Sequence, residues 1–422
     1  MIDIKLHTPI GVNDILPDEK RKRQAVYRRI EEVFERYGYN SVESPMFEYL
    51  EVFSDEKMGS TNPKDMFRFF DRNGAALALR SDMTPPIARI AATAYADVNG
   101  PLRFSYSGNA FRYNKDYQGK LCEFSQAGIE LMGAGGADAD AEAVALAVKS
   151  ILAAGISEFR LHIGEVSFFN SILDETGLNN DERNILKDLI ANRNYVGMED
   201  MLEEREMDGN IKTLFMELPK LVGAGNVIET AKGLVGSMEA QKALSKLEEL
   251  YNCLKFYGVE EYVVFDLGMV NRLNYYTGII FSVYTYGTGY SVLDGGRYDN
   301  LVKQFGKNIP AVGFGIKINE VMNVLEANGM EQDNGGTKAL FAYGQKGKAT
   351  AMKTADIYRN GGVNVENSLI GEDLESNIEY AKQRGMETIL YFEDAVNIKF
   401  VKIVDEIGVL ISDITVDDLV KP

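Results

Sequence analysis

The sequence predicts an α+β protein: a mixed domain of strands and helices, interrupted by a helical insertion and followed by a smaller α/β domain. Residues 41–165 alternate short strand patterns with loops, and residues 166–261 are helical and strongly charged. Strands alternate with helices again from Lys338 onward. A chain of 422 residues is long enough for two or three domains, each with its own hydrophobic core.

The segment LPDEKRKRQAVYRRIEEVFERYGY, which begins at Leu16, predicts a first amphipathic helix. Its apolar side chains recur at helical spacing, Asp18 lies near the expected start and Gly38 lies just past the expected end. The basic run RKRQAVYRR is explained more simply as the solvated face of this helix than as a nucleic-acid patch.

A second helix is predicted in the alanine-rich segment ADADAEAVALAVKSILAAG, which begins at Ala137. Acidic residues in its first turn and the glycine at its end, Gly155, fit the helix macrodipole. The overlapping stretch GAGGADAD resembles a phosphate loop only superficially. It lacks the Gly-Lys-Ser/Thr ending of such loops, so a turn followed by a helix start is the better explanation.

Residues 166–261 contain charged helical segments and no strand pattern, so we expect them to form an insertion between two strand-rich segments. Strand patterns resume at Tyr262 and continue to about Ile318. The alternation that follows predicts a small, largely parallel α/β domain. The expected boundaries are a core domain over 1–325, a linker over 326–337 in the Gly-, Asn- and acid-rich stretch EANGMEQDNGGT, and the last domain over 338–422.

Charge and composition narrow the function classes. A net charge of −18 argues against a protein that binds nucleic acid or another polyanion, because such proteins use Lys and Arg to displace counterions from the phosphates. Cys122 and Cys253 are far apart and lack CxxC spacing, which excludes a disulfide scaffold and a zinc-finger-type site. His162 lies in the alternating strand FRLHIGE, where a core or sheet-face role is the simpler interpretation.

No membrane association is expected. The sequence contains no apolar run of the roughly 18–20 residues that a membrane helix needs. The N-terminal stretch MIDIKLHTPIG has no signal-peptide core, so a cytoplasmic location is the expectation.

Four segments combine polar side chains with glycines in a way that core packing does not require. They are LALRSDMTPPIAR from Leu77, PLRFSYSGNAFRYNKDYQGKLCEFSQAGIELMG from Pro101, DLGMVNRLNYYTGIIFSV from Asp266, and DGGRYDNLVKQFGKNIPAVGFGIKI from Asp294.

Together with TPIGVNDILPDE near the N-terminus, these segments resemble the catalytic core of class II aminoacyl-tRNA synthetases, specifically the histidyl-tRNA synthetases. The resemblance covers essentially the whole chain, and the motifs occur in that family's order. It implies a class II synthetase-like core, an antiparallel sheet flanked by helices. It also implies the helical insertion and a C-terminal α/β domain like that family's anticodon-binding domain.

Departures from the family pattern fall where a synthetase holds ATP. Bidentate arginines suit phosphate binding, because their planar forks match phosphate oxygens. The second-motif arginine is present as Arg112, but the basic loop after it is replaced by a stretch with only Lys115 and Lys120. In the third motif, the arginine expected against the γ-phosphate is Glu320, and this charge reversal opposes triphosphate binding.

The stretch VNRLNYYTG carries another departure. The family pattern is Val-Arg-Gly-Leu-Asp-Tyr-Tyr-Thr-Gly, whose arginine assists adenylate formation. Here Asn271 occupies the arginine position and Arg272 the glycine position. Neighbouring side chains on a strand point to opposite faces, so Arg272 cannot simply take over that role.

The resemblance also implies a histidine-binding pocket. Carboxylates suit the ammonium group, hydroxyl and amide groups suit the imidazole, and aromatic rings form walls. Asp82 is a shorter carboxylate where the family has Glu. The positions that match the family's pocket are Asp82, Thr84, Arg112, Gln126, Glu130, Tyr275, Tyr276 and Tyr298.

Each of these residues also has a structural interpretation. Gln126 and Glu130 could be a satisfied hydrogen-bonding pair, and Tyr275 and Tyr276 could serve sheet packing. Arg297, in GGRYD, could be an ion-pair partner. Only the combination of all these residues with the synthetase motifs favours a pocket.

The chain keeps the pocket residues, lacks the phosphate-binding arginines and is acidic. In this combination it resembles a paralogous, non-catalytic family, the regulatory subunits of short-form ATP phosphoribosyltransferase. That enzyme catalyses the first step of histidine biosynthesis. That resemblance implies no cofactor, no metal and no tRNA. It implies a catalytic subunit as partner, histidine as effector, and a homodimer within a hetero-octamer. The last domain has 14 acidic against 10 basic residues, so we expect a structural or partner-contacting role for it.

Two alternatives stay open. A divergent active histidyl-tRNA synthetase would catalyse histidine-dependent ATP–pyrophosphate exchange, which the Asn271 and Glu320 replacements oppose. A stand-alone histidine-binding sensor or scaffold would bind histidine without a phosphoribosyltransferase partner.

Overall fold

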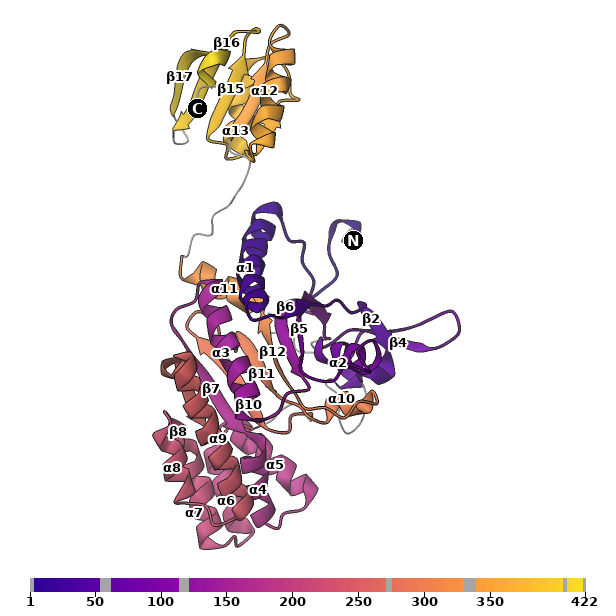
Figure 1. Cartoon of the computed structure of the whole chain (residues 1–422), viewed down its shortest axis with the longest axis vertical. Helices are drawn as coiled ribbons and strands as arrows, with labels where there is room; N and C mark the ends of the chain where they lie inside the picture. The colour runs from indigo at the N-terminus through magenta and orange to yellow at the C-terminus, as the bar shows by residue number, and fades with distance from the viewer. Residues whose placement is uncertain are drawn as a thin grey trace. The chain divides into compact units, whose positions relative to one another are not determined.

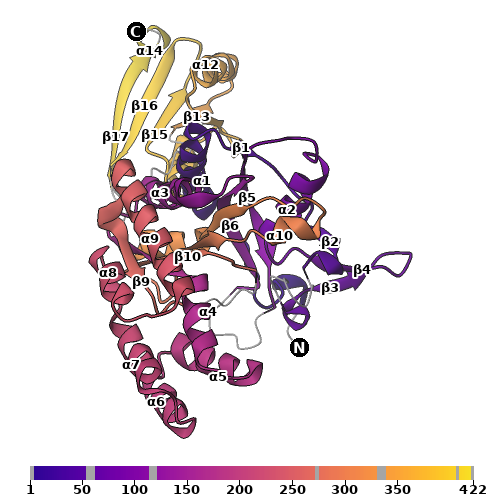
Figure 2. The ribbon, with the colours of Figure 1, turned by 60° about the horizontal axis from the view of Figure 1, so that its bottom comes forward.

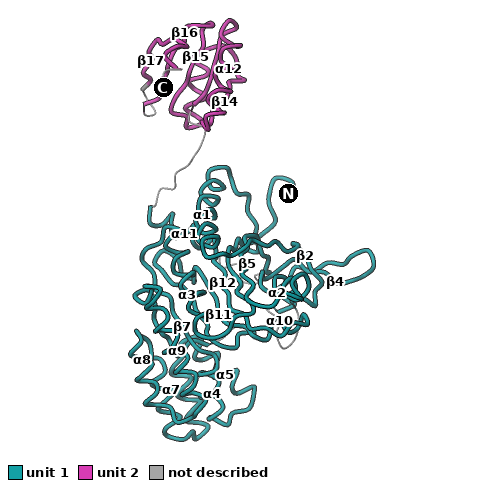
Figure 3. The backbone as a smooth tube through the Cα atoms, viewed as in Figure 1, with its two compact units in different colours: residues 1–332 teal, residues 333–422 magenta. Residues whose placement is uncertain are grey.

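The computed structural model describes residues 4–53, 62–113, 121–270, 275–329, 339–404 and 408–419. The chain divides into two compact units, residues 1–332 and 333–422 (Figure 3). Among the described residues, no helix combines the length and the apolar character needed to cross a membrane.

The larger unit is built around a nine-stranded sheet of order β1-β5-β6-β12-β11-β10-β7-β9-β8 (Figure 1). Its pairings are antiparallel except for β1 with β5 and β7 with β9. In sheet order, the strands are Asn40–Ser41, Leu102–Phe111, Glu123–Met132, Ala311–Lys317, Leu293–Arg297, Ile279–Thr285, Phe159–Glu165, Val263–Asp266 and Val222–Gly223.

One face of this sheet packs against α1 (Pro17–Arg36) and α3 (Gly136–Ala154) to form the main hydrophobic core. The ring centroids of Phe34 on α1 and Phe314 on β12 are 6.0 Å apart. The alanines of α3 are largely buried, and their small side chains let the helix approach the sheet closely. The opposite face of the sheet does not pack against α1 and α3, and it carries the polar side chains described below.

At one end of the unit, α2 (Thr84–Thr93) lies beside a three-stranded sheet of order β2-β4-β3 (Figure 2). Its strands are Phe47–Tyr49, Ala76–Leu79 and Arg68–Phe70. The short helix α10 (Leu301–Gln304) packs on α2. The unit's last helix, α11 (Ile318–Ala327), follows β12 directly.

The helical insertion lies at the other end of the sheet (Figure 2). Its helices α4 to α9 are Val166–Glu175, Asn180–Ala191, Tyr195–Glu204, Gly209–Glu217, Asn226–Lys232 and Met238–Tyr257. The expectation of a segment without strands was wrong in one detail, because the two-residue strand β8 pairs with β9. Such a short edge strand carries too few residues to show a period-2 pattern.

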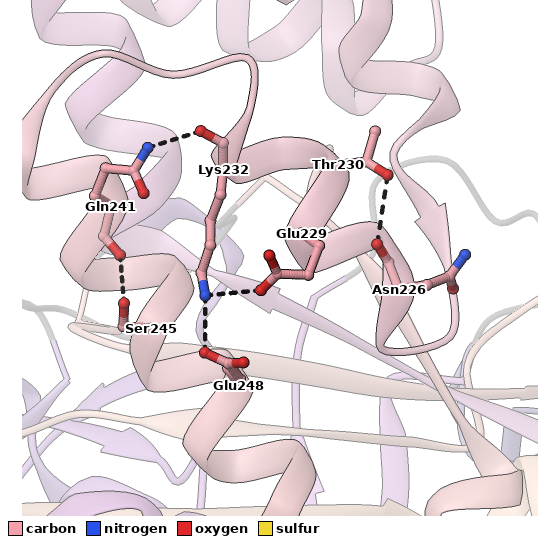
Figure 4. A network of polar contacts seen from close by, with 7 residues as sticks. All are labelled: Asn226, Glu229, Thr230, Lys232, Gln241, Ser245 and Glu248. Carbon is pink, nitrogen blue, oxygen red and sulfur yellow. Dashed lines mark hydrogen bonds and ion pairs between the residues drawn. The ribbon is translucent and has the colours of Figure 1, made fainter.

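A polar network holds the end of α8 against α9 (Figure 4). Lys232 Nζ lies 2.9 Å from Glu229 Oε1 and 2.8 Å from Glu248 Oε2. Gln241 Nε2 donates to the Lys232 carbonyl oxygen at 2.7 Å, so one side chain also satisfies a carbonyl at the helix end.

The smaller unit has a five-stranded sheet of order β14-β13-β15-β16-β17. The three strands β14, β13 and β15 pair in parallel, but β15, β16 and β17 pair antiparallel, so the sheet is less parallel than expected. Only four residues, 393–396, join β15 to β16, too few for a parallel crossover. The strands β13 to β17 are Ala339–Tyr343, Val365–Asn367, Thr388–Phe392, Asn397–Val404 and Gly408–Thr415, and the helices α12 to α14 are Lys348–Asn360, Leu374–Gln383 and Val416–Leu419.

Candidate functional site

The sheet face opposite α1 and α3 carries the predicted pocket residues. Strand register places Glu130 opposite Gly313, and Gly313 opposite Gly296 on the next strand. Glycine is required at these positions because other side chains lie flat on the sheet there. A Cβ at Gly313 would overlap Glu130 Oε2, and a Cβ at Gly296 would lie 2.7 Å from the Tyr276 ring.

Glu130, on β6, is the centre of a buried cluster. Its side chain is 1% exposed, and its two oxygens accept hydrogen bonds from different hydroxyls. Thr84 Oγ1 donates to Oε1 at 2.7 Å, and the Tyr298 hydroxyl donates to Oε2. Burial raises the pKa of Glu130 to about 8, although the two hydroxyl donors oppose this rise. At neutral pH the site therefore favours the neutral carboxyl group.

Asp82 lies beside this cluster, just before α2. Its Oδ1 accepts from the Thr84 backbone N–H at 3.1 Å, which helps to start the helix, and its Oδ2 lies 3.4 Å from the Tyr275 hydroxyl. The ring centroid of Tyr275 is 4.8 Å from that of Tyr276 and 5.8 Å from that of Tyr298. Burial raises the pKa of all three tyrosines, so they stay protonated and can donate hydrogen bonds.

Arg112 and Gln126 border the cluster without bonding to Glu130. Arg112 Nε donates to the Ser81 carbonyl oxygen at 2.9 Å, and its guanidinium lies 5.4 Å from the centroid of the Phe124 ring. A Cβ at Gly315 would lie 3.3 Å from Gln126 Nε2, which places the amide over the sheet face. The structure thus brings the predicted pocket residues to one face. Their ligand-binding role stays a prediction.

A cavity of about 1080 Å³ adjoins the cluster on the same face. Of the eight predicted pocket residues, Tyr276 and Arg112 are the two that line it, and the other six lie behind them in the buried cluster or at its border. His162 and Asp266 line it on the strands nearest the insertion. His162 Nδ1 lies 3.6 Å from Asp266 Oδ2, so this histidine has the expected sheet-face position. A drug-sized ligand fits within roughly 300–1,000 Å³, so the cavity has ample room for an amino acid.

An ion pair spans the cavity floor. Lys317 Nζ lies 2.6 Å from Asp294 Oδ2 and 2.7 Å from Ser291 Oγ. Ser282 Oγ donates to Asp294 Oδ1 at 2.7 Å. Burial alone would raise the pKa of Asp294, but Lys317 and the serine hydroxyl lower it below its usual value, so this carboxylate stays ionised.

The positions that depart from the synthetase pattern have structural partners where they are described. Glu320 Oε2 accepts from Thr288 Oγ1 at 2.7 Å. Its neighbour Asn319 accepts from the Ser125 backbone N–H through Oδ1 at 2.8 Å. Asn271, Arg272, Lys115 and Lys120 lie outside the described residues. Within the described part of the chain, no three His, Cys, Asp or Glu side chains group as metal ligands would.

Sequence reasoning missed Tyr106, Asp294 and Lys317 as contributors to this face. Tyr106 lies opposite Gly128 on the neighbouring strand, and its hydroxyl lies 3.3 Å from the Phe314 carbonyl oxygen. An aromatic residue facing a glycine across a strand pair is a signal, but it requires the register, which the sequence alone does not provide.

The chain is similar to two named groups of proteins. A family model described as Histidyl-tRNA synthetase matches residues 11–321. A curated ATP phosphoribosyltransferase regulatory subunit from Acetivibrio thermocellus is 40% identical over 422 residues, which is 100% of both chains.

Solved structures agree with the predicted fold class. One from Bacillus halodurans, named as an ATP phosphoribosyltransferase regulatory subunit/histidyl-tRNA synthetase, has a TM-score of 0.83 and 30% identity, covering 93% of this chain and 100% of that chain. A histidyl-tRNA synthetase from a Nostoc species has a TM-score of 0.82 at 22% identity, covering 98% of each chain, a likeness that concerns the fold alone. These likenesses confirm a class II synthetase-like fold.

Proposed function

The chain belongs to the family of ATP phosphoribosyltransferase regulatory subunits, which is built on a histidyl-tRNA synthetase-like fold, and from this premise we propose that histidine is its effector. In this proposal the chain catalyses nothing itself. It binds a short-form catalytic subunit, is required for that subunit's activity, and transmits feedback inhibition when histidine occupies the pocket around Glu130.

The Glu130 cluster is the observation that carries the histidine assignment. Histidine presents an ammonium group, a carboxylate and an imidazole with both a donor and an acceptor nitrogen. Asp82 supplies a carboxylate for the ammonium group, and Arg112 supplies a cation for the carboxylate. A neutral Glu130 can either donate to or accept from an imidazole nitrogen, and Tyr276 offers a flat wall beside the cavity.

The position and hydrogen bond of Glu320 support a site that does not bind a triphosphate. Its carboxylate bonds to the Thr288 hydroxyl in the fold and places a negative charge where the synthetase pattern has an arginine. A sensor needs only a difference in histidine affinity between two states of its complex, and it needs no phosphate site.

We further propose that the chain forms a homodimer within a hetero-octamer, and that it binds no tRNA. The acidic balance of the chain supports the second point, because nucleic-acid affinity comes mainly from Lys and Arg contacts to phosphate. The unit 333–422 then has a structural or partner-contacting role.

The decisive experiment mixes the full chain with a short-form catalytic subunit and measures product formation from ATP and phosphoribosyl pyrophosphate. We expect product only when both chains are present, and loss of product on adding histidine. No gain over the catalytic subunit alone would overturn the proposed function.

A matched pair of variants locates the histidine site. Glu130→Gln keeps the shape of the cluster but replaces one accepting oxygen with an amide nitrogen that can only donate, so we expect it to weaken inhibition by histidine. Glu165→Gln is the control, because Glu165 is also buried at 3% exposure but bonds Ser167 at the start of α4. Equal inhibition of both variants would place the histidine site elsewhere.

A further inference from the structure

The first turns of α3 carry three acidic residues at alternate positions, and each bonds a different part of the unit. Asp138 Oδ1 accepts from Cys253 Sγ on α9 at 3.4 Å. Asp140 pairs with Arg297 at the end of β11. Glu142 makes a two-pronged ion pair with Arg103 on β5, with both N···O distances 2.9 Å. The stretch ADADAEA is therefore more than a favourable helix start.

Arg297 is a buried cation held by two carboxylates. Its side chain is 9% exposed. Nε donates to Asp140 Oδ1 at 2.8 Å, and a terminal nitrogen donates to Asp299 Oδ1, also at 2.8 Å. Asp299 in turn accepts from the Ala311 backbone N–H at 3.1 Å, which fastens the turn after β11 to the start of β12.

This ion network adjoins two residues of the proposed pocket, Tyr298 and Tyr276. Tyr298, whose hydroxyl holds Glu130, lies between Arg297 and Asp299 in the chain. Thr277, which follows Tyr276, donates its backbone N–H to the Arg297 carbonyl oxygen at 2.8 Å. The Thr277 hydroxyl accepts from the Asp299 backbone N–H at 3.0 Å.

The next residue in the chain shows how closely this turn and Arg297 pack. A Cβ at Gly278 would lie only 3.0 Å from Arg297 Cδ, so no side chain separates the turn from the arginine. The turn therefore packs directly on Arg297; it follows Tyr276 in the chain, and Tyr298 follows Arg297.

We propose that Arg297 is a positioning residue: through Asp140 and Asp299 it sets Tyr298 against Glu130 and links the pocket to α3 and α9. This inference rests on the proposed histidine site. Pocket occupancy moves Tyr298 or Tyr276, Arg297 carries the movement to Asp140, and α3 passes it to α9 through their packed faces. The conformation of the helical insertion thereby depends on whether the pocket is occupied.

A buried ion pair is a poor device for stability alone, because desolvation offsets much of its attraction. It does fix geometry, since breaking it leaves an uncompensated buried charge. An apolar contact could tolerate small rearrangements, whereas a guanidinium shared by two carboxylates accepts few positions. These properties suit a link that must transmit a small displacement.

The test compares Asp140→Asn with Glu142→Gln in the full chain. Both remove one carboxylate charge from the same helix, but only Asp140 bonds Arg297. Isothermal titration should show histidine binding weakened about tenfold in Asp140→Asn and little changed in Glu142→Gln.

Hydrogen exchange in the unmodified chain should show histidine-induced protection in both β11 and α9. In Asp140→Asn at saturating histidine, protection should persist in β11 and disappear from α9. Equal histidine affinity of the two variants, or full α9 protection in Asp140→Asn, would overturn the proposal.

A ligand-free measurement separates this inference from the histidine assignment. Tyr298→Phe and Asp140→Asn are combined in a double-mutant cycle on the free energy of unfolding. We expect the two effects to be non-additive, because Asp140 acts through Arg297 on the position of the hydroxyl that Tyr298→Phe removes. Additive effects contradict the positioning role. Absence of histidine binding in the unmodified chain, with non-additive effects, contradicts only the histidine assignment.

Discussion

Glu130 on β6 and Gly313 on β12 face each other across the sheet so closely that a single added carbon at Gly313 would overlap the carboxyl group. The glycine is therefore part of the site, since it creates the space in which Glu130 meets Thr84 and Tyr298.

Gly313→Ala should displace Glu130 and impair histidine binding. The overlap cannot be relieved cheaply, because the Ile129 carbonyl oxygen also lies within the excluded space. Overpacking of this kind costs about 1–3 kcal/mol. Urea unfolding and calorimetric titration measure both effects. Gly74→Ala is a poor control because its φ is +85°, whereas Gly209→Ala meets no atom within 4 Å and has no positive φ. Histidine affinity equal to that of Gly209→Ala would contradict the assignment.

The stability of the protein should fall as pH rises from about 5 to 8, through Glu130. Its pKa is about 4.5 when unfolded and about 8 when folded, so the folded state binds more protons in this window. Stability therefore decreases as pH increases, by roughly 3–5 kcal/mol in total, and changes no further above the folded pKa.

Glu130→Gln removes this titration, so the difference between the unmodified chain and the variant isolates it. The free energy of unfolding of the unmodified chain, minus that of the variant, should decline between pH 5 and 8. A difference independent of pH would show that the folded carboxyl group keeps its ordinary pKa.

The fold was more predictable from the sequence than the site. Helices α1 and α3 could be predicted because apolar spacing and end signals act locally, and both lie where expected. The antiparallel β16 and β17 and the short β8 depend on pairing with distant strands, which local patterns do not encode. The resemblance to the synthetase family identified Glu130 and Tyr298 as pocket residues. That they share a hydrogen bond became visible only from the register and the turn after β11.

Tyr298→Phe should destabilise the fold and leave Glu130 more strongly protonated. The substitution removes the donor to Glu130 Oε2 but keeps the ring that packs on Tyr275. A buried acceptor left without its partner costs about 1–3 kcal/mol. Loss of the donor also raises the pKa of Glu130, because that bond favours the ionised form. Chemical denaturation at pH 6 and pH 9 tests both statements, and the loss should be larger at pH 9.

Tyr262→Phe is the control for this hydroxyl deletion. Its ring stacks on Phe159 at 5.0 Å between centroids, on the sheet face away from Glu130. A loss in Tyr298→Phe no greater than in Tyr262→Phe, or one independent of pH, would mean that the hydroxyl does not hold the carboxyl group.

Glu320→Arg restores the charge of the synthetase pattern, and we expect it to restore no synthetase activity. The new guanidinium would take the place of the acceptor for the Thr288 hydroxyl, so the variant should lose about 1 kcal/mol of stability. ATP activation requires several cations placed together around the phosphates, and one added charge does not rebuild that arrangement. Glu326→Arg, an exposed position on the same helix α11, makes the same change of charge and is the control. The measurement is histidine-dependent ATP–pyrophosphate exchange. Exchange in Glu320→Arg but not in Glu326→Arg would mean that the rest of the adenylation site is intact and that this one position had silenced it.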